Sequence, residues 1–264
     1  MDEKLIGTGL VVLGGKDIIV KLLGPTAEYL GQETKNLVKK CNINITRIFN
    51  RAAKLLGNKL EQPGVVNPRI LKHIINEGAF CEDELSAEYF GGVLASSRTE
   101  VSRDDRGLTI ISTLSSLSTY QVRTHYILYY IVRKLFKGID IELGIANKRR
   151  KEMKIFIPLN VYYKCMDFSN NENPNVIMPH ILMGMRRLDL IEGDYAFGSK
   201  NEVAKVYPKV DSDGFFFMPT IFGIELYLWA HGHSNAEPEI ILATDVEFKQ
   251  SAVLDIPDGA VIAK

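Results

Sequence analysis

One strongly apolar segment limits most what this chain can fold into. Ser118-Thr119-Tyr120-Gln121 has the form of a capping box, in which the serine hydroxyl and the glutamine amide each satisfy a backbone amide at a helix start. The helix that follows carries the run from Tyr126 to Val132 and is apolar on all sides. Such a helix must be surrounded by other elements. The sequence therefore predicts a buried helix over about 120–136, at the centre of a first domain.

Amphipathic helices are expected before this segment. Between residues 16 and 60 the apolar period is helical, and we expect breaks near Gly24-Pro25 and near Asn42. The clearest apolar face consists of Ile45, Ile48, Phe49, Ala52 and Leu56. This region therefore predicts two or three helices that each bury one side.

Further helices are predicted up to the capping box. Asn67-Pro68 is typical of an N-cap followed by a first helical position, so a helix is expected from there to about Gly78. Another is expected from about Glu82 to the polar stretch that begins at Ser96, and the stripe from Ile110 to Leu117 predicts one more.

The last half of the chain has a different texture. A helix is expected over 178–191, a hairpin from segments around 195–197 and 203–207, and a final helix from Thr220 as its cap to about His231. The tail over 239–261 alternates apolar and polar residues, which predicts strands. We expect an α+β protein with a helical domain over 1–138, a connecting segment over 139–176, and a winged-helix-like α/β domain over 177–264 that ends in strands.

Composition limits the classes of partner and compartment. Lys plus Arg and Asp plus Glu number 32 each, so the whole chain has no bulk attraction to phosphate or to an anionic membrane. The cysteines, Cys41, Cys81 and Cys165, are odd in number and far apart, which predicts free thiols in a reducing, cytoplasmic compartment. The apolar run over 5–13 follows two acidic residues and is too short to span a membrane.

Two motifs imitate ligand sites without completing them. Residues 10–17 imitate a phosphate-binding loop, but Leu10 stands where the first glycine is needed and Asp17 stands where a Ser or Thr is needed. His231-Gly232-His233 places two imidazoles close together after a helix end, whereas zinc sites use three or four ligands. We expect no cofactor and no metal, and the scattered histidines predict no catalytic triad.

A dense polar connection between two helices is the first candidate surface. Adjacent carboxylates point in different directions on a helix, so Asp104 and Asp105 are a poor acid–base pair. A helix cap with local salt bridges is one interpretation of this segment. The functional alternative is an interaction surface made of Arg98, Arg103, Asp104, Asp105 and Arg106.

A second candidate surface lies in the winged-helix-like region. In DNA-binding proteins of that shape, basic residues on the helix and the wing neutralise phosphates. Nearby Glu192, Asp194 and Glu202 weaken such a face, and many folds of this shape bind proteins instead. The residues that would contact a nucleic acid are Arg186, Arg187, Lys200, Lys205 and Lys209.

The order of several motifs is similar to the Abi-alpha (abortive infection alpha) family. The resemblance rests on a proline-bearing N-terminal helix, an acidic helix start and a later closing pattern, namely Leu22-Leu23-Gly24-Pro25, Glu82-Asp83-Glu84-Leu85, Tyr89 to Ser97, Leu117-Ser118, Met185 to Ile191 and Pro219 to Gly223. The chain differs from the family in having Gly91-Gly92 inside a helix and a long tail with strand character.

The resemblance implies a bacterial or phage-related protein that stops phage propagation, and it supplies no catalytic residues. We expect a non-enzymatic protein that acts through protein contacts, as a homo-oligomer or with a protein partner such as a phage protein. The alternative is a winged-helix regulator that binds DNA.

Overall fold

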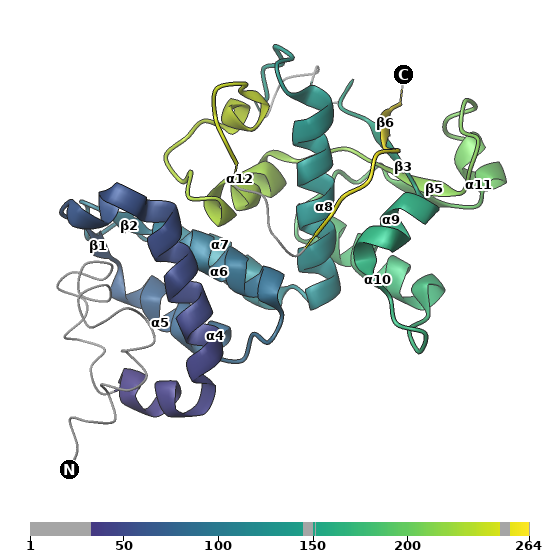
Figure 1. The fold of residues 1–264 in the computed structure, drawn as a ribbon. Helices are drawn as coiled ribbons and strands as arrows, with labels where there is room; N and C mark the ends of the chain where they lie inside the picture. Colours follow the sequence, from purple (N-terminus) through teal and green to yellow (C-terminus); the bar gives the residue numbers. More distant parts are fainter. Residues whose placement is uncertain (1–32, 145–149, 151, 249–253, 264) are drawn as a thin grey trace. The chain divides into compact units, whose positions relative to one another are not determined.

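The computed structural model describes residues 33–144, 150, 152–248 and 254–263 (Figure 1). In these residues helices predominate, and the strands form one two-stranded and one four-stranded sheet. The expected α+β class is confirmed. The chain forms two compact units, the first from residues 1–116 with 228–235 and the second from residues 117–227 with 236–264.

The first unit is mainly helical. Its elements are α4 (Glu33–Leu56), the 3-10 helix η1 (Gly57–Glu61), β1 (Val65–Val66), α5 (Pro68–Gly78), α6 (Glu84–Ser96), β2 (Arg98–Thr99) and α7 (Gly107–Ser116). Strands β1 and β2 are antiparallel, with Val65 opposite Thr99. The unit also includes the last turn of α12 (Ile221–Ala230) and the residues that follow it.

Helix α4 runs without interruption through the expected break at Asn42, so that prediction is wrong. A single asparagine lowers helix stability by less than about 1 kcal/mol. Burial of an apolar face stabilises the helix by more, at about 25 cal/mol per Å². The four buried residues of this face are Ile45, Ile48, Phe49 and Ala52, as the period predicted.

Two side-chain caps begin the next helices. The Asn67 Oδ1 atom accepts from the Arg69 amide at 3.0 Å, and the Asp83 Oδ2 atom accepts from the Ser86 amide at 2.8 Å. The Asn67-Pro68 helix start is confirmed. Each such cap stabilises a helix by about 1 kcal/mol.

The two glycines inside α6 allow close packing. A Cβ atom at Gly91 would lie 2.7 Å from the Ile48 backbone oxygen of α4, and one at Gly92 would lie 1.8 Å from the Ala230 backbone oxygen. Both distances are shorter than carbon–oxygen contact permits. Glycine is therefore required at both positions because the neighbouring backbones approach α6 directly.

The second unit combines helices with the four-stranded sheet. Its elements are α8 (Thr119–Phe136), β3 (Ile155–Pro158), α9 (Leu159–Met166), α10 (Pro174–Arg187), β4 (Ala196–Gly198), α11 (Lys200–Ala204), β5 (Gly214–Phe217), most of α12, the 3-10 helix η3 (Pro238–Leu242) and β6 (Val261–Ile262). The strand order is β4-β5-β3-β6, and every pair is antiparallel. The segment 139–176, expected as a connection, thus contains a central strand and a helix.

Helix α8 confirms the prediction of a capped and buried helix, but it lies in the second unit rather than at the centre of a first domain. The Ser118 amide donates to the Gln121 side-chain oxygen at 2.9 Å, and the Gln121 amide donates to the Ser118 hydroxyl. The side chains from Tyr126 to Tyr129 are almost completely buried. Burial raises the pKa of the Tyr129 hydroxyl well above its usual value.

The structure corrects three expectations in the last half of the chain. Helix α10 spans Pro174–Arg187 rather than 178–191, and it begins early because Asn173 and Pro174 repeat the N-cap and first-position pattern of α5. The strand that pairs with β4 is β5, whereas the segment around 203–207 contains the end of α11. In the described part of the tail, η3 replaces the expected strand at 238–242 and β6 is the one strand.

Three predictions for the N-terminal region lie outside the described residues. These are the apolar run over 5–13, the imitation of a phosphate-binding loop over 10–17, and the break at Gly24-Pro25. They stay predictions. Within the described ranges, no helix combines the length and apolar character that crossing a bilayer requires.

Candidate interaction surface

Arg98, the first residue of the predicted interaction surface, closes the end of η1. Its guanidinium donates to the backbone oxygens of Lys59 at 3.0 Å, Leu60 at 3.5 Å and Gln62. Carbonyl groups at a helix end lack partners within the helix. Partial burial lowers the pKa of the Arg98 guanidinium. Arg98 therefore holds the fold locally, and its side chain is turned toward its own unit.

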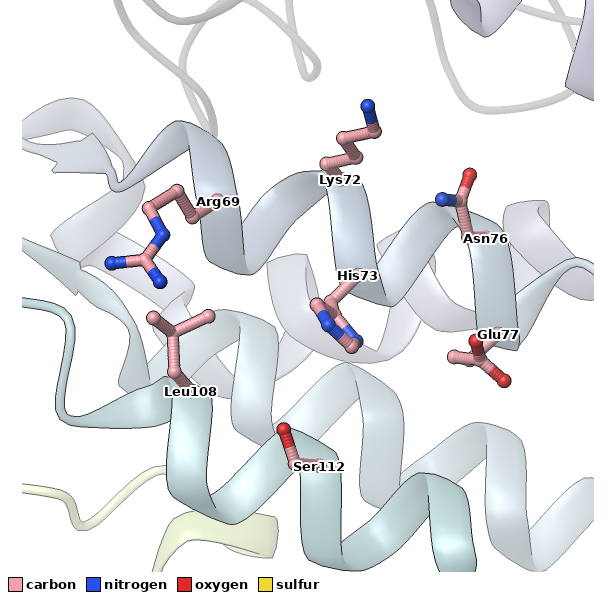
Figure 2. A pocket seen from close by; sticks show the side chains of 7 residues that line it. All are labelled: Arg69, Lys72, His73, Asn76, Glu77, Leu108 and Ser112. Atoms are coloured by element: carbon pink, nitrogen blue, oxygen red, sulfur yellow. The ribbon is translucent and has the colours of Figure 1, made fainter.

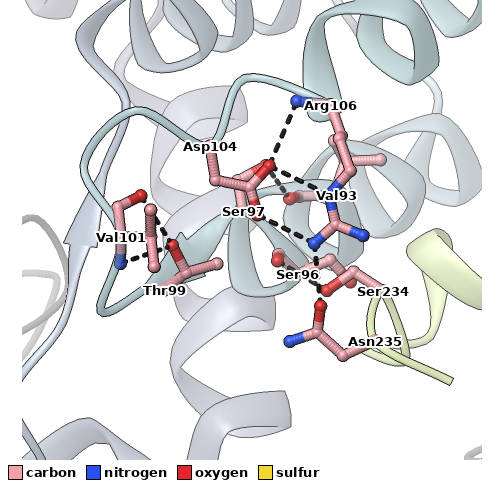
Figure 3. Close-up of polar contacts among 9 residues, drawn as sticks. All are labelled: Val93, Ser96, Ser97, Thr99, Val101, Asp104, Arg106, Ser234 and Asn235. Atoms are coloured by element: carbon pink, nitrogen blue, oxygen red, sulfur yellow. Dashed lines mark hydrogen bonds and ion pairs between the residues drawn. The ribbon is translucent and has the colours of Figure 1, made fainter.

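Asp104 and Arg106 form a rigid pair before α7 (Figure 3). The Arg106 side chain donates to Oδ1 of Asp104 at 3.0 Å and to Oδ2 at 2.8 Å, and its backbone amide donates to Oδ1 at 3.2 Å. These bonds lower the pKa of the Asp104 carboxyl, chiefly through the Arg106 side chain. Arg106 also donates to Oδ1 of Asn235 at 2.8 Å. The predicted local salt bridge is confirmed.

Serine hydroxyls hold the segment after α12 in the same neighbourhood (Figure 3). The Ser234 hydroxyl donates to the Ser96 backbone oxygen at 2.7 Å. The Ser96 hydroxyl donates in turn to the Trp229 backbone oxygen at 2.8 Å. Together with the Arg106–Asn235 bond, these contacts fix residues 229–235 beside the C-terminal end of α6. His231 and His233 lie in this segment, as expected for a loop after a helix end.

Two contacts join the polar connection to the start of α5. The Asn67 side-chain amide donates to the Ser102 backbone oxygen at 3.1 Å, and Arg69 forms an ion pair with Asp105 at 3.2 Å. Arg103 lies between them in the chain and is exposed. The structure therefore holds the connection against α5 while it leaves Arg103, Asp105 and Arg106 at the surface.

An open groove lies between α5 and α7, next to this connection (Figure 2). Its volume is about 510 Å³, and it is lined by Arg69, Lys72, His73, Asn76, Glu77, Leu108 and Ser112. In Figure 2, Arg69 lies near Leu108 and His73 lies opposite Ser112, so the two helices run in the same direction. Glu77 also points to the α7 side, whereas Lys72 points away from it.

The groove brings together serine, histidine and glutamate, the residue types of a hydrolase triad. In the described part of the chain, His73 makes no hydrogen bond to Ser112 or to Glu77. All three side chains are exposed. An activated serine needs a hydrogen-bonded histidine that is oriented by the acid. The expected absence of a catalytic set stays a prediction, and the groove offers charges and a shape for binding.

The five residues proposed to contact a nucleic acid all lie in the second unit and are exposed. Arg186 and Arg187 occupy the last turn of α10, Lys200 begins α11, and Lys205 and Lys209 follow α11. The Lys205 ammonium forms an ion pair with Glu202 at 2.8 Å. This pairing reduces the positive charge that α11 could offer to a phosphate.

Among the side chains that the structure describes, the thiols and the possible metal ligands show no reactive arrangement. Cys81 and Cys165 are free, and burial raises the pKa of each thiol to about 11. A thiol with so high a pKa is a poor nucleophile at neutral pH. In the described ranges, no group of three or more His, Cys, Asp or Glu residues is placed to hold a metal ion.

Sequence reasoning identified the polar connection but missed the groove. The available signal was the repeat of Arg69, His73 and Glu77 at every fourth residue, which places them on one side of α5. The opposite side of the same helix carries the buried Ile70, Leu71, Ile74 and Ile75. That α7 borders the polar side could not be read from the sequence.

Comparisons with protein-family models, with curated proteins and with solved structures found no match.

Proposed function

We propose that this chain is a non-enzymatic anti-phage protein that acts through protein contacts made by its first unit. The resemblance to the Abi-alpha family motivates the biological role. The observation that carries the molecular role is the exposed polar area formed by the α5–α7 groove and residues 100–106, which we call the groove surface.

The groove surface is suited to binding because it is already ordered. Asn67 holds Ser102, Arg69 holds Asp105, and Arg106 holds both Asp104 and Asn235. A partner that docks on such a surface does not have to order the loop. Ordering costs about 0.5–1.5 kcal/mol for each long side chain that binding immobilises.

Phage plating on a bacterial host tests the proposal. Cells that express the chain are compared with cells that carry an empty vector, at high and at low phage dose. We expect protection at low dose and collapse of the culture at high dose. Equal plating on both hosts across a broad phage panel would contradict the anti-phage role.

A surface variant tests whether the groove surface is responsible. Arg103→Glu reverses an exposed charge that lies between Ser102 and the Asp104–Arg106 pair, and we expect it to reduce protection at an unchanged protein level. Lys164→Glu, an exposed charge reversal in α9 of the second unit, is the matched control. Equal protection by Arg103→Glu and Lys164→Glu would contradict a role for this loop.

DNA binding by the second unit is the second candidate function, favoured by the exposure of all five of its proposed basic residues. It requires a duplex affinity that falls steeply with salt. Arg186→Glu combined with Arg187→Glu should abolish a gel shift at low salt. The absence of any shift with the unmodified protein at low salt would end this alternative.

A further inference from the structure

Two of the charges that α5 contributes to the groove, Arg69 and Glu77, are placed symmetrically about His73, whereas Lys72 points away from α7. Arg69 and Glu77 lie four residues before and four residues after His73, all on the side of α5 that borders the groove. At 1.5 Å per residue, the two charges are separated by about 12 Å along the helix axis. The Arg69 side chain stays 72% exposed beside Asp105, so it can accept a second carboxylate. The positive end and the negative end are therefore equally far from the histidine.

Exposed apolar side chains stand at both ends of this row. Phe80 follows Glu77 and is 70% exposed, and its amide donates to the Glu77 backbone oxygen at 3.2 Å. Val101 is 53% exposed, and its neighbour Ser102 is bonded to the Asn67 side chain at the start of α5. Each end of the row thus has an exposed apolar side chain, and at the Arg69 end the guanidinium also pairs with Asp105.

We propose that the α5 face is a self-complementary interface that binds a second copy of this chain about a twofold axis through His73. This inference rests on the proposed function and names the partner of the same surface. With the two α5 helices antiparallel, Arg69 of each copy meets Glu77 of the other. The same rotation brings Phe80 of each copy toward Val101 of the other.

A second copy fits this pattern because a twofold interface needs a surface that complements itself. If one residue of the first copy contacts another residue of the second copy, the reverse contact forms as well. Charges of opposite sign at equal distances from a midpoint meet that condition. A row of one sign would instead have predicted a partner of the opposite sign. The spacing of about 12 Å is the same in both copies, so both ion pairs form in one register.

The expected dimer is weak. Helix α5 has 11 residues and is about 16 Å long, so the contact lies at the small end of the range for specific interfaces. Exposed ion pairs contribute little to affinity because water and salt screen them. Dimerisation should therefore depend on protein concentration and should weaken as salt is added.

Sedimentation equilibrium with two charge-reversal variants tests the interface. Arg69→Glu places two negative groups opposite each other across the axis, and Glu77→Arg places two positive groups there. Each variant alone should dimerise at least tenfold more weakly than the unmodified chain. An equimolar mixture of the two variants restores both opposite-charge pairs, so it should form a mixed dimer with nearly the original affinity.

Three controls keep this test decisive. Circular dichroism checks that each variant is folded, Lys164→Glu should leave the dimer unchanged, and Phe80→Ser should weaken the dimer without affecting the fold. A chain that is monomeric at hundreds of micromolar would overturn the inference, and so would variants that dimerise normally or a mixture that stays monomeric. If phage protection persists in any of these cases, the proposed function stands and the α5 interface alone fails.

Discussion

Helices α5 and α8 carry the same polar residue types and use them in opposite ways. In α8, His125 is fully buried and its Nε2 atom lies 3.0 Å from the Gly223 backbone oxygen, while Arg133 is almost as deeply buried. In α5, Arg69 and His73 lie at the surface beside the groove. Residue type alone therefore does not separate a structural role from a binding role, whereas burial and bonding partners do.

The difference follows from what surrounds each helix. The α8 side chains are enclosed by aromatic rings, with His125 4.5 Å from Tyr129 between ring centres. A buried polar group must find a partner or it destabilises the fold, so these side chains form bonds inside the protein. The outer face of α5 is exposed, so its polar groups do not need a partner inside the protein. The exposed Arg69, His73 and Glu77 side chains can contact another molecule.

The largest loss of stability is expected from a substitution in α8. Arg133 donates to the Ile241 backbone oxygen at 2.6 Å and to the Val246 backbone oxygen, and it lies over the Phe248 ring at 4.2 Å. Arg133→Met removes these bonds and leaves both oxygens without their donor, which should lower the free energy of unfolding by about 3 kcal/mol. Urea denaturation measures this change in the free energy of unfolding. A decrease in the free energy of unfolding below about 0.5 kcal/mol would contradict the view that the polar groups of α8 stabilise the fold while those of α5 do not.

A smaller effect is expected at the start of α5. Asn67 caps the helix and also holds Ser102. Asn67→Ala should lower the free energy of unfolding by about 1 kcal/mol. Asn67→Ser, which keeps a capping oxygen but is too short to serve both contacts, should lose less. Equal losses for the two variants in urea denaturation would show that the cap is not the source of the effect.

The Asp104–Arg106 pair predicts a pH dependence. The pKa of the Asp104 carboxyl is lowered in the folded state, so its contribution to stability is present above the unfolded value of about 3.9 and is lost as pH falls through the lower folded value. Asp104→Asn should therefore lower the free energy of unfolding at pH 6. Near pH 2 the variant and the unmodified chain should differ less in this free energy. A gap of equal size at both pH values would contradict this account.

The smallest effect on stability is expected at His73. Its side chain is exposed in the groove, so His73→Ala should change the free energy of unfolding by less than about 0.5 kcal/mol. The matched variant His125→Ala in α8 should be far more destabilising, because it opens a cavity and removes the bond to Gly223. Comparable losses at the two histidines would show that the groove side of α5 stabilises the fold as much as the α8 core does.

Local signals predicted much of the fold. The α8 capping box, the Asn67-Pro68 start of α5 and the buried face of α4 each depend on residues a few positions apart, so the sequence displays them directly. The predicted start of α10 is wrong although Asn173-Pro174 carries the same signal as Asn67-Pro68. The asparagines that surround Pro174 are typical of a loop, and this composition hides the N-cap signal of Asn173.

Distant pairings could not be predicted in the same way. Strand β4 pairs with β5, although helix α11 lies between them in the chain. The sequence around 203–207 does not indicate that the partner strand lies further along the chain. The groove depends likewise on α7 lying beside α5. The polar residues of the connection were identified from sequence, but the backbone partners of Arg98 lie about 40 residues away and the Asn235 partner of Arg106 lies about 130 residues away.

The central claim is that the α5 face, rather than the α8 core, carries the contacts on which function depends. Phage plating on cells that express Arg69→Glu, Glu77→Arg, or both variants together tests it most directly. We predict that each variant alone loses protection at normal protein levels and that co-expression restores it. Full protection by each variant alone, or no recovery when the two are co-expressed, would contradict the claim.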